Sequence, residues 1–114
     1  KPVVIDIRVG DLCLFHCATP GATLDNEIWV ERKRRTTTRF GMSSYGVGRD
    51  LAAQETTLAQ KYNIDESQHA AHGGCFPILL KSGLMIGTIT VSGLAQVWDH
   101  IVITEAIEQH LMVR

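Results

Sequence analysis

The sequence predicts an α+β fold in which helices pack on a mainly antiparallel sheet. Two observations predict it: two pairs of short strand-like segments each joined by a tight turn, and three stretches whose apolar residues recur at helical spacing. Because tight turns join antiparallel strands, each pair is expected to form a hairpin. The order is two strands, two helices, at least two strands and one helix, which argues against a doubly wound sheet.

The first hairpin is predicted over residues 3–18. Residues 3–9 alternate apolar and polar side chains with a period of two, which is typical of a half-buried strand. Gly10 and Asp11 can turn the chain, and residues 12–18 return as the second strand. The loop that follows at residues 19–22 contains proline and glycine.

Two helices are predicted between the hairpins. Thr23 or Asp25 can cap the first, which ends or bends at Gly41. The side chains that recur at helical spacing along it are Trp29, Lys33, Thr36 and Phe40. A second helix is expected from Ser43 or Ser44 to about Tyr62.

The second hairpin and the last helix complete the predicted order. Residues 75–80 and 84–91 are strand-like and are joined by a turn at Ser82 and Gly83. Residues 96–112 have helical periodicity with apolar side chains on more than one face. We expect this helix to be covered twice, by the sheet and by something else.

The length and composition of the chain indicate a single domain and argue against several classes of protein. The chain has 114 residues, 45% hydrophobic, with 11 basic and 12 acidic side chains. Such balanced charge argues against nucleic-acid binding, and no apolar run is long enough to be inserted in a membrane. Without a signal peptide we expect a cytoplasmic protein, and the missing initial Met suggests that the natural N-terminal segment is absent. Three cysteines do not make a disulfide framework, so free thiols are expected.

The densest charged segment lies in the first predicted helix. Arg32, Arg35 and Arg39 fall on one helical face, where three guanidinium groups can hold a carboxylate or a phosphate. The alternative is a solvated or subunit-contacting surface that Glu27 and Glu31 partly neutralise. Both interpretations remain open at this point.

A second candidate segment is His72-Gly73-Gly74, which precedes a predicted strand. Two glycines allow a ligand to approach the backbone closely and to use free amides there. His69 and His72 have a spacing suited to a metal ion on a helix, but the glycines favour a loop, so we expect no metal site.

Two other histidines are candidates for the same site. Simple alternation places His16 on one strand face with Leu12 and Leu14, opposite Cys13, and such a histidine is usually a satisfied core or interface group. It joins the site only if the fold brings it near His72 or an arginine. His100 near the start of the last helix is a further candidate for a polar or axial contact.

Several of these segments together resemble a known family. They are Ala71-His72-Gly73-Gly74-Cys75-Phe76-Pro77-Ile78, Ile86-Gly87-Thr88-Ile89-Thr90-Val91-Ser92-Gly93-Leu94, Gln96 and Asp99-His100. They are similar to the signature of the GlcG/HbpS-like haem-degrading-domain family, and residues 3–8 and 29–35 resemble its uncharacterised branch with yeast and bacterial members. The resemblance implies a profilin-like fold with a five-stranded antiparallel sheet, one more helix before the first strand, homo-oligomers, and haem or a related tetrapyrrole as a candidate cofactor.

Three functions are compatible with these features. The first is a homo-oligomeric protein that binds a small anionic ligand between the arginine face and the His72-Gly73-Gly74 loop, with His16 or His100 in contact. The second is an adaptor whose basic helix meets an acidic partner protein. The third is an enzyme in which a histidine acts as general acid or base, and it requires the histidines and Arg35 to converge in one pocket.

Overall fold

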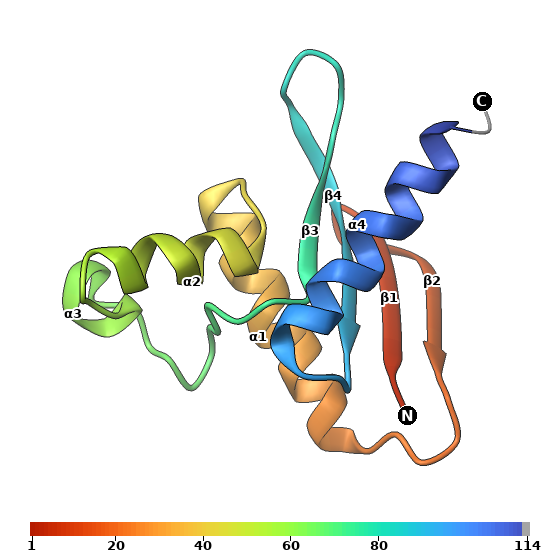
Figure 1. The fold of residues 1–114 in the computed structure, drawn as a ribbon, viewed down its shortest axis with the longest axis horizontal. Helices are drawn as coiled ribbons and strands as arrows, with labels where there is room; N and C mark the ends of the chain where they lie inside the picture. The colour runs from red at the N-terminus through yellow and green to blue at the C-terminus, as the bar shows by residue number, and fades with distance from the viewer. Residues whose placement is uncertain (113–114) are drawn as a thin grey trace.

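The computed structural model describes residues 1–112, which form one four-stranded sheet with helices on both faces (Figure 1). The elements are β1 (Val4–Val9), β2 (Leu12–Ala18), α1 (Leu24–Phe40), α2 (Ser44–Ala53), α3 (Leu58–Tyr62), β3 (Cys75–Leu79), β4 (Met85–Ser92) and α4 (Gln96–Met112). The strand order is β2-β1-β4-β3 and every pair is antiparallel. The predicted α+β class, both hairpins and the last helix are confirmed.

The expected fifth strand is not present among residues 1–112. Residues 63–74, between α3 and β3, contain no strand. Ile64 instead packs with Leu58 in a small core between α2 and α3, and the backbone N–H of Ala70 donates to the backbone oxygen of Arg32. This segment therefore takes its partners from helices, so the prediction of five strands is wrong for the described residues.

The predicted helix from residue 44 to residue 62 is divided into α2 and α3. The break lies at residues 54–57, where Glu55 has a positive φ of 52°. Thr57 then caps α3 by accepting a hydrogen bond from the backbone N–H of Gln60 at 3.1 Å. A strong N-cap inside the expected helix starts a new helix there, which explains the error.

A bulge in β2 changes which side chains share a face. Ile7 pairs with Phe15 and Arg8 pairs with Cys13, so Leu14 has no partner in β1. Because cross-strand partners share a face, Cys13 lies with Arg8 and not with Phe15. The alternation predicted for this strand is therefore wrong for Cys13, and also for Leu12, which pairs with Val9 and lies on the face opposite His16.

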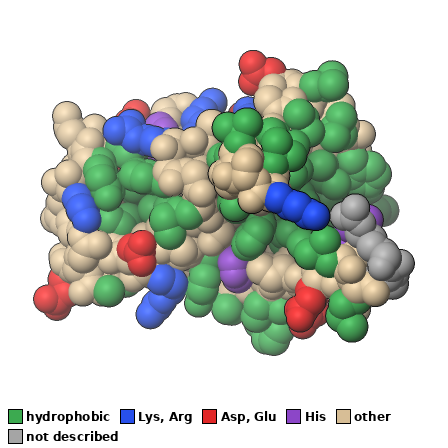
Figure 2. All heavy atoms as spheres, turned by 90° about the horizontal axis from the view of Figure 1, so that it is seen from above, with side chains coloured by type: hydrophobic (Ala, Val, Ile, Leu, Met, Phe, Trp, Pro, Cys, Tyr) green, Lys and Arg blue, Asp and Glu red, His purple; other side chains and the backbone are tan. Residues whose placement is uncertain are grey.

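The two faces of the sheet are covered unequally. α1 packs against β4, β3 and β1 on one face, and α4 crosses the other face over β3 and β4 (Figure 1). Between α4 and the sheet lies a mostly apolar groove of about 570 Å³, lined by β1, β3, β4 and α4. Seen from above in Figure 2, hydrophobic side chains gather on the right half of the view.

Candidate functional site

A polar cavity lies where the first half of α1, the His72-Gly73-Gly74 loop and the β4–α4 connection meet. Its volume is about 190 Å³. We call it the Lys33 cavity, and its lining includes Asn26, Trp29, Lys33, His72, Ser92, Gln96 and Asp99. The glycine loop therefore meets the helix of the arginine cluster within one chain.

A buried ion pair forms one wall of this cavity. Lys33 is 3% exposed, and its Nζ lies 3.0 Å from Oδ2 of Asp99 and 3.3 Å from the backbone oxygen of Val91. Asp99 is 1% exposed and also accepts from the backbone N–H of Leu94 at 2.9 Å. Burial lowers the pKa of Lys33, although Asp99 opposes this effect. Two of the three ammonium hydrogens thus have acceptors among the described residues.

Close packing explains both glycines of the loop. The backbone N–H of Gly73 donates to Oε1 of Gln96 at 2.9 Å, so the prediction of a free amide at Gly73 is wrong. Gly74 has a φ of 137°, and a Cβ there would lie 2.6 Å from Nζ of Lys33 and 2.4 Å from the backbone oxygen of Val91. Position 74 must be glycine because the chain passes directly against the ion pair.

His72 belongs to an aromatic and cationic cluster at the mouth of the cavity. Its ring lies 5.2 Å from the ring of Trp29, and the guanidinium of Arg32 lies 4.3 Å from the same tryptophan ring. Burial first, and then the positive charges of Lys33 and Arg32, lower the pKa of His72. Its imidazole is therefore neutral at pH 7.

The three arginines do not act on a common site. Arg32 turns toward Trp29, and its Nη2 donates to the backbone oxygen of Glu66 at 2.6 Å. Arg35 is exposed and donates to the side chain of Gln68 at 3.0 Å. Arg39 is also exposed and lies over the ring of Phe40 at 5.8 Å. Of these three arginines only Arg32 lies near His72, because the loop that contains His72 runs along one side of α1.

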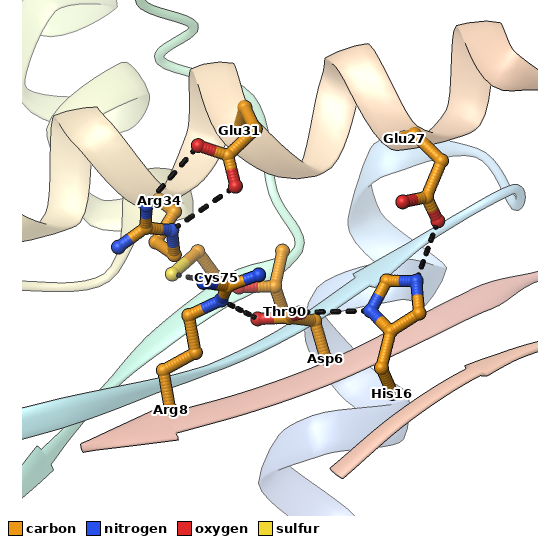
Figure 3. A network of polar contacts seen from close by, with 8 residues as sticks. All are labelled: Asp6, Arg8, His16, Glu27, Glu31, Arg34, Cys75 and Thr90. Atoms are coloured by element: carbon orange, nitrogen blue, oxygen red, sulfur yellow. Dashed lines mark hydrogen bonds and ion pairs between the residues drawn. The ribbon is translucent and has the colours of Figure 1, made fainter. Parts of the chain in front are cut away.

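His16 lies outside the cavity, in a hydrogen-bonded network under α1 (Figure 3). Its Nδ1 is 2.8 Å from Oδ2 of Asp6 and its Nε2 is 2.9 Å from Oε1 of Glu27. Asp6 is completely buried and also accepts from Nε of Arg8 at 2.9 Å. The hydrogen bond to Asp6, followed by the charge of Glu27, raises the pKa of His16. The interpretation of His16 as a satisfied structural group is consistent with these contacts.

His100 also lies outside the Lys33 cavity. Its ring stacks on Tyr45 at 4.7 Å and lies 6.2 Å from the ring of Phe76. Burial lowers its pKa, and its Nδ1 has no hydrogen-bond partner among the described residues. The three candidate histidines therefore occupy three separate surroundings.

Lys33 and Trp29 are site residues that the sequence did not point to. Both lie on the helical stripe that predicts the inward face of α1, and a lysine on such a stripe indicates a buried charge with a partner. Asp99 is the partner, and the sequence pointed to it only as part of the family motif. Lysines inside a charged run are usually solvated, which is why this one was overlooked.

Residues 1–112 contain neither a cluster of three metal ligands nor a helix able to span a membrane. Among them, His, Cys, Asp and Glu side chains do not form a group of three able to hold a metal ion. None of the helices described has the length and apolar character needed to cross a membrane.

Comparison with known proteins now identifies the family. The model of the haem-degrading protein HbpS-like family matches residues 1–108. The chain belongs to this family. A UPF0303 protein of Streptomyces avermitilis is 48% identical over 110 residues, which cover 96% of this chain and 68% of that relative. The resemblance inferred from the sequence motifs is confirmed.

Two solved structures share the fold. The crystal structure of Ybr137w matches 88% of this chain and 58% of its own length, with 39% identity and a TM-score of 0.81. A complex of PduOC with haem matches 94% of this chain and 77% of its own length, with 20% identity and a TM-score of 0.73. This HbpS-like chain thus spans little more than half the length of Ybr137w.

Proposed function

We propose that this HbpS-like domain binds a small polar molecule with one acidic group in the Lys33 cavity. The observation that supports this most directly is the buried ammonium of Lys33, which lines the cavity and has one hydrogen without an acceptor among residues 1–112. Trp29 offers a flat surface, and Asn26 and Gln96 offer amides, for the rest of the ligand. A charge-assisted hydrogen bond from Lys33 would hold the acidic group.

A tetrapyrrole does not fit this cavity. Pockets for ligands of that size have volumes of about 300–1,000 Å³, and the Lys33 cavity has about 190 Å³. The expected arginine face contributes only Arg32 near the cavity, so two propionates would lack their guanidinium partners. We therefore do not assign to the Lys33 cavity the haem that is bound in the PduOC complex.

Binding is favoured over the two alternative functions. The enzyme hypothesis requires His16, His72, His100 and Arg35 to converge, whereas each of them has different contact partners in this chain. The adaptor hypothesis is supported only by Arg35 and Arg39, which are exposed and so could meet an acidic partner protein. Self-association, a cytoplasmic location and a profilin-like arrangement stay predictions.

The test compares an acid with a neutral molecule of the same shape. Benzoate and benzamide are titrated into the labelled protein while the amide signals of Gly93 and Leu94, which line the cavity, are followed by NMR. We expect benzoate to shift both signals in a saturable way and to bind about tenfold more tightly than benzamide. K33Q should abolish this preference, because glutamine can still donate to Asp99 but has no charge.

K61Q is the matched control, since Lys61 is exposed on α3 and does not line the cavity. Should K33Q fail to fold, W29L provides a second variant and is expected to weaken both probes equally. Equal binding of benzoate and benzamide would show that no acidic group is recognised. Unmoved Gly93 and Leu94 signals with both probes would overturn the proposal altogether.

A further inference from the structure

A second cavity shares His72 with the Lys33 cavity. It is lined by α1, α2, the start of α3 and residues 66–72, and its volume is about 190 Å³. We call it the Arg32 cavity, and its lining includes Arg32, Leu51, Thr57, Glu66, His69 and His72. Arg32 and Lys33 are neighbours in α1, so each cavity has one cation of the same helix on its wall.

The guanidinium of Arg32, which lines this cavity, is incompletely hydrogen bonded. Its Nη2 donates to the backbone oxygen of Glu66, but its buried Nε has no hydrogen-bond partner among residues 1–112. A buried donor on a charged group is costly to leave unsatisfied, so such groups usually have an acceptor. Arg32 lines the cavity, so a small turn of its guanidinium would present this donor to an acceptor on a ligand.

His72 is the wall shared by the two cavities. It lines both of them, its side chain is partly exposed beside Trp29, and no hydrogen bond from its ring is found in the described part of the chain. Exposed side chains change rotamer on the picosecond to nanosecond scale, so this wall can move. Together the two cavities provide about 380 Å³, which is within the range of small-molecule sites.

We propose that the Lys33 cavity and the Arg32 cavity are two halves of one site for a flat dicarboxylate. One carboxylate binds Lys33, the other accepts from the guanidinium of Arg32, and the flat middle of the ligand lies against Trp29 and His72. The exposed carboxylates of Asp25 and Glu66 stand at the rims, one in each cavity, and disfavour any further negative charge. This inference rests on the proposed function and extends it from one acidic group to two.

Terephthalate and isophthalate test the proposal against benzoate, because all three share one ring. The amide signal of Gly93 reports on the Lys33 cavity, and that of Ala70, whose N–H donates to the backbone of Arg32, reports on the other. We expect at least one dicarboxylate to shift both signals with a single dissociation constant, about tenfold tighter than benzoate. Benzoate should shift Gly93 alone. R32Q should reduce the dicarboxylate to the affinity of benzoate, and R35Q, at an arginine that lines neither cavity, should change nothing.

Each other result has a defined meaning. If benzoate binds but neither dicarboxylate binds more tightly or moves Ala70, the two cavities are separate and water alone satisfies Arg32, so this inference is wrong while the proposed function stands. Signals of Gly93 and Ala70 that saturate at different concentrations would also overturn it. If no probe moves Gly93, both proposals fail together.

Discussion

The face of the sheet toward α1 and the face toward α4 differ in chemistry. Toward α1, Asp6 and Thr90 are completely buried although both are polar. Toward α4, Ile5 and Ile89 line an open apolar groove. Apolar burial is favourable but not directional, whereas a buried polar group must meet a specific partner. The comparison therefore indicates that the α1 face fixes the positions of the elements, and the α4 face supplies apolar surface.

The polar face shows how this positioning works. His16, Asp6, Thr90 and Cys75 lie in one row across all four strands, since each is the cross-strand neighbour of the next. The hydroxyl of Thr90 donates to Sγ of Cys75 at 3.3 Å, and Asp6 bonds His16 (Figure 3). A shift of any strand by one residue would break this row. The Lys33 cavity is built at the end of the same face.

The largest effect is expected at the Lys33–Asp99 pair, which ties α1 to α4 and so joins the two sides of the sheet. Replacing Lys33 by Met leaves the buried carboxylate of Asp99 without a counter-charge, and we expect a loss of about 3–5 kcal/mol of unfolding free energy. The double variant K33M/D99L removes both charges and should recover most of that loss. Urea denaturation of the single and double variants measures the difference. A double variant as unstable as K33M would show that the pair itself is required.

A smaller loss is expected at Asp6, within the polar face. D6N removes the negative charge that both His16 and Arg8 contact. Because those two partners are partly exposed, we expect the free energy of unfolding to fall by about 2–3 kcal/mol, less than for a fully buried pair. D11N is the matched control, since Asp11 is exposed in the β1–β2 turn. Denaturation midpoints compare the two variants. Equal stability of D6N and D11N would contradict the importance of the polar row.

The sequence predicted the two hairpins, α1 and α4, because alternation, capping and turn residues are local signals. It could not predict the bulge at Leu14, which depends on how β2 pairs with β1. It located the His72 loop but assigned its glycines to a ligand, whereas they accommodate Lys33 and Gln96. The pairing of Lys33 with Asp99 joins residues 66 positions apart. Local sequence patterns span far fewer residues, so they cannot predict such a contact.

Stability should depend on pH through His16, which links β2 to the rest of the polar face. Its pKa is raised in the folded state, chiefly by Asp6, so the folded state holds the proton more tightly than the unfolded state. This stabilisation is complete below about pH 6.5, the unfolded value, and is lost as the pH rises through the folded pKa. Because solvent screens the exposed side chain of His16, we expect its protonation to contribute at most about 1 kcal/mol to the free energy of unfolding.

The difference in unfolding free energy between wild type and H16Q isolates this effect, and it should shrink from pH 5.5 to pH 8.5. The subtraction is needed because the pKa values of His72 and His100 are lowered, which contributes stability of the opposite pH dependence. H110Q, at an exposed histidine of α4, serves as the control. A difference that grows with pH would contradict the raised pKa.

The smallest effect is expected on the open side of the apolar face. Val102 lines the groove and is 43% exposed, whereas the neighbouring Ile103 is 2% exposed against the sheet. V102T should therefore cost less than about 0.5 kcal/mol, and I103V about 0.5–1.5 kcal/mol. Denaturation at two protein concentrations checks both values. V102T could instead destabilise the protein as much as I103V does, with a larger loss at the higher protein concentration. That result would show that a second copy of the chain covers the groove in solution, and that the apolar face is fully buried only in that assembly.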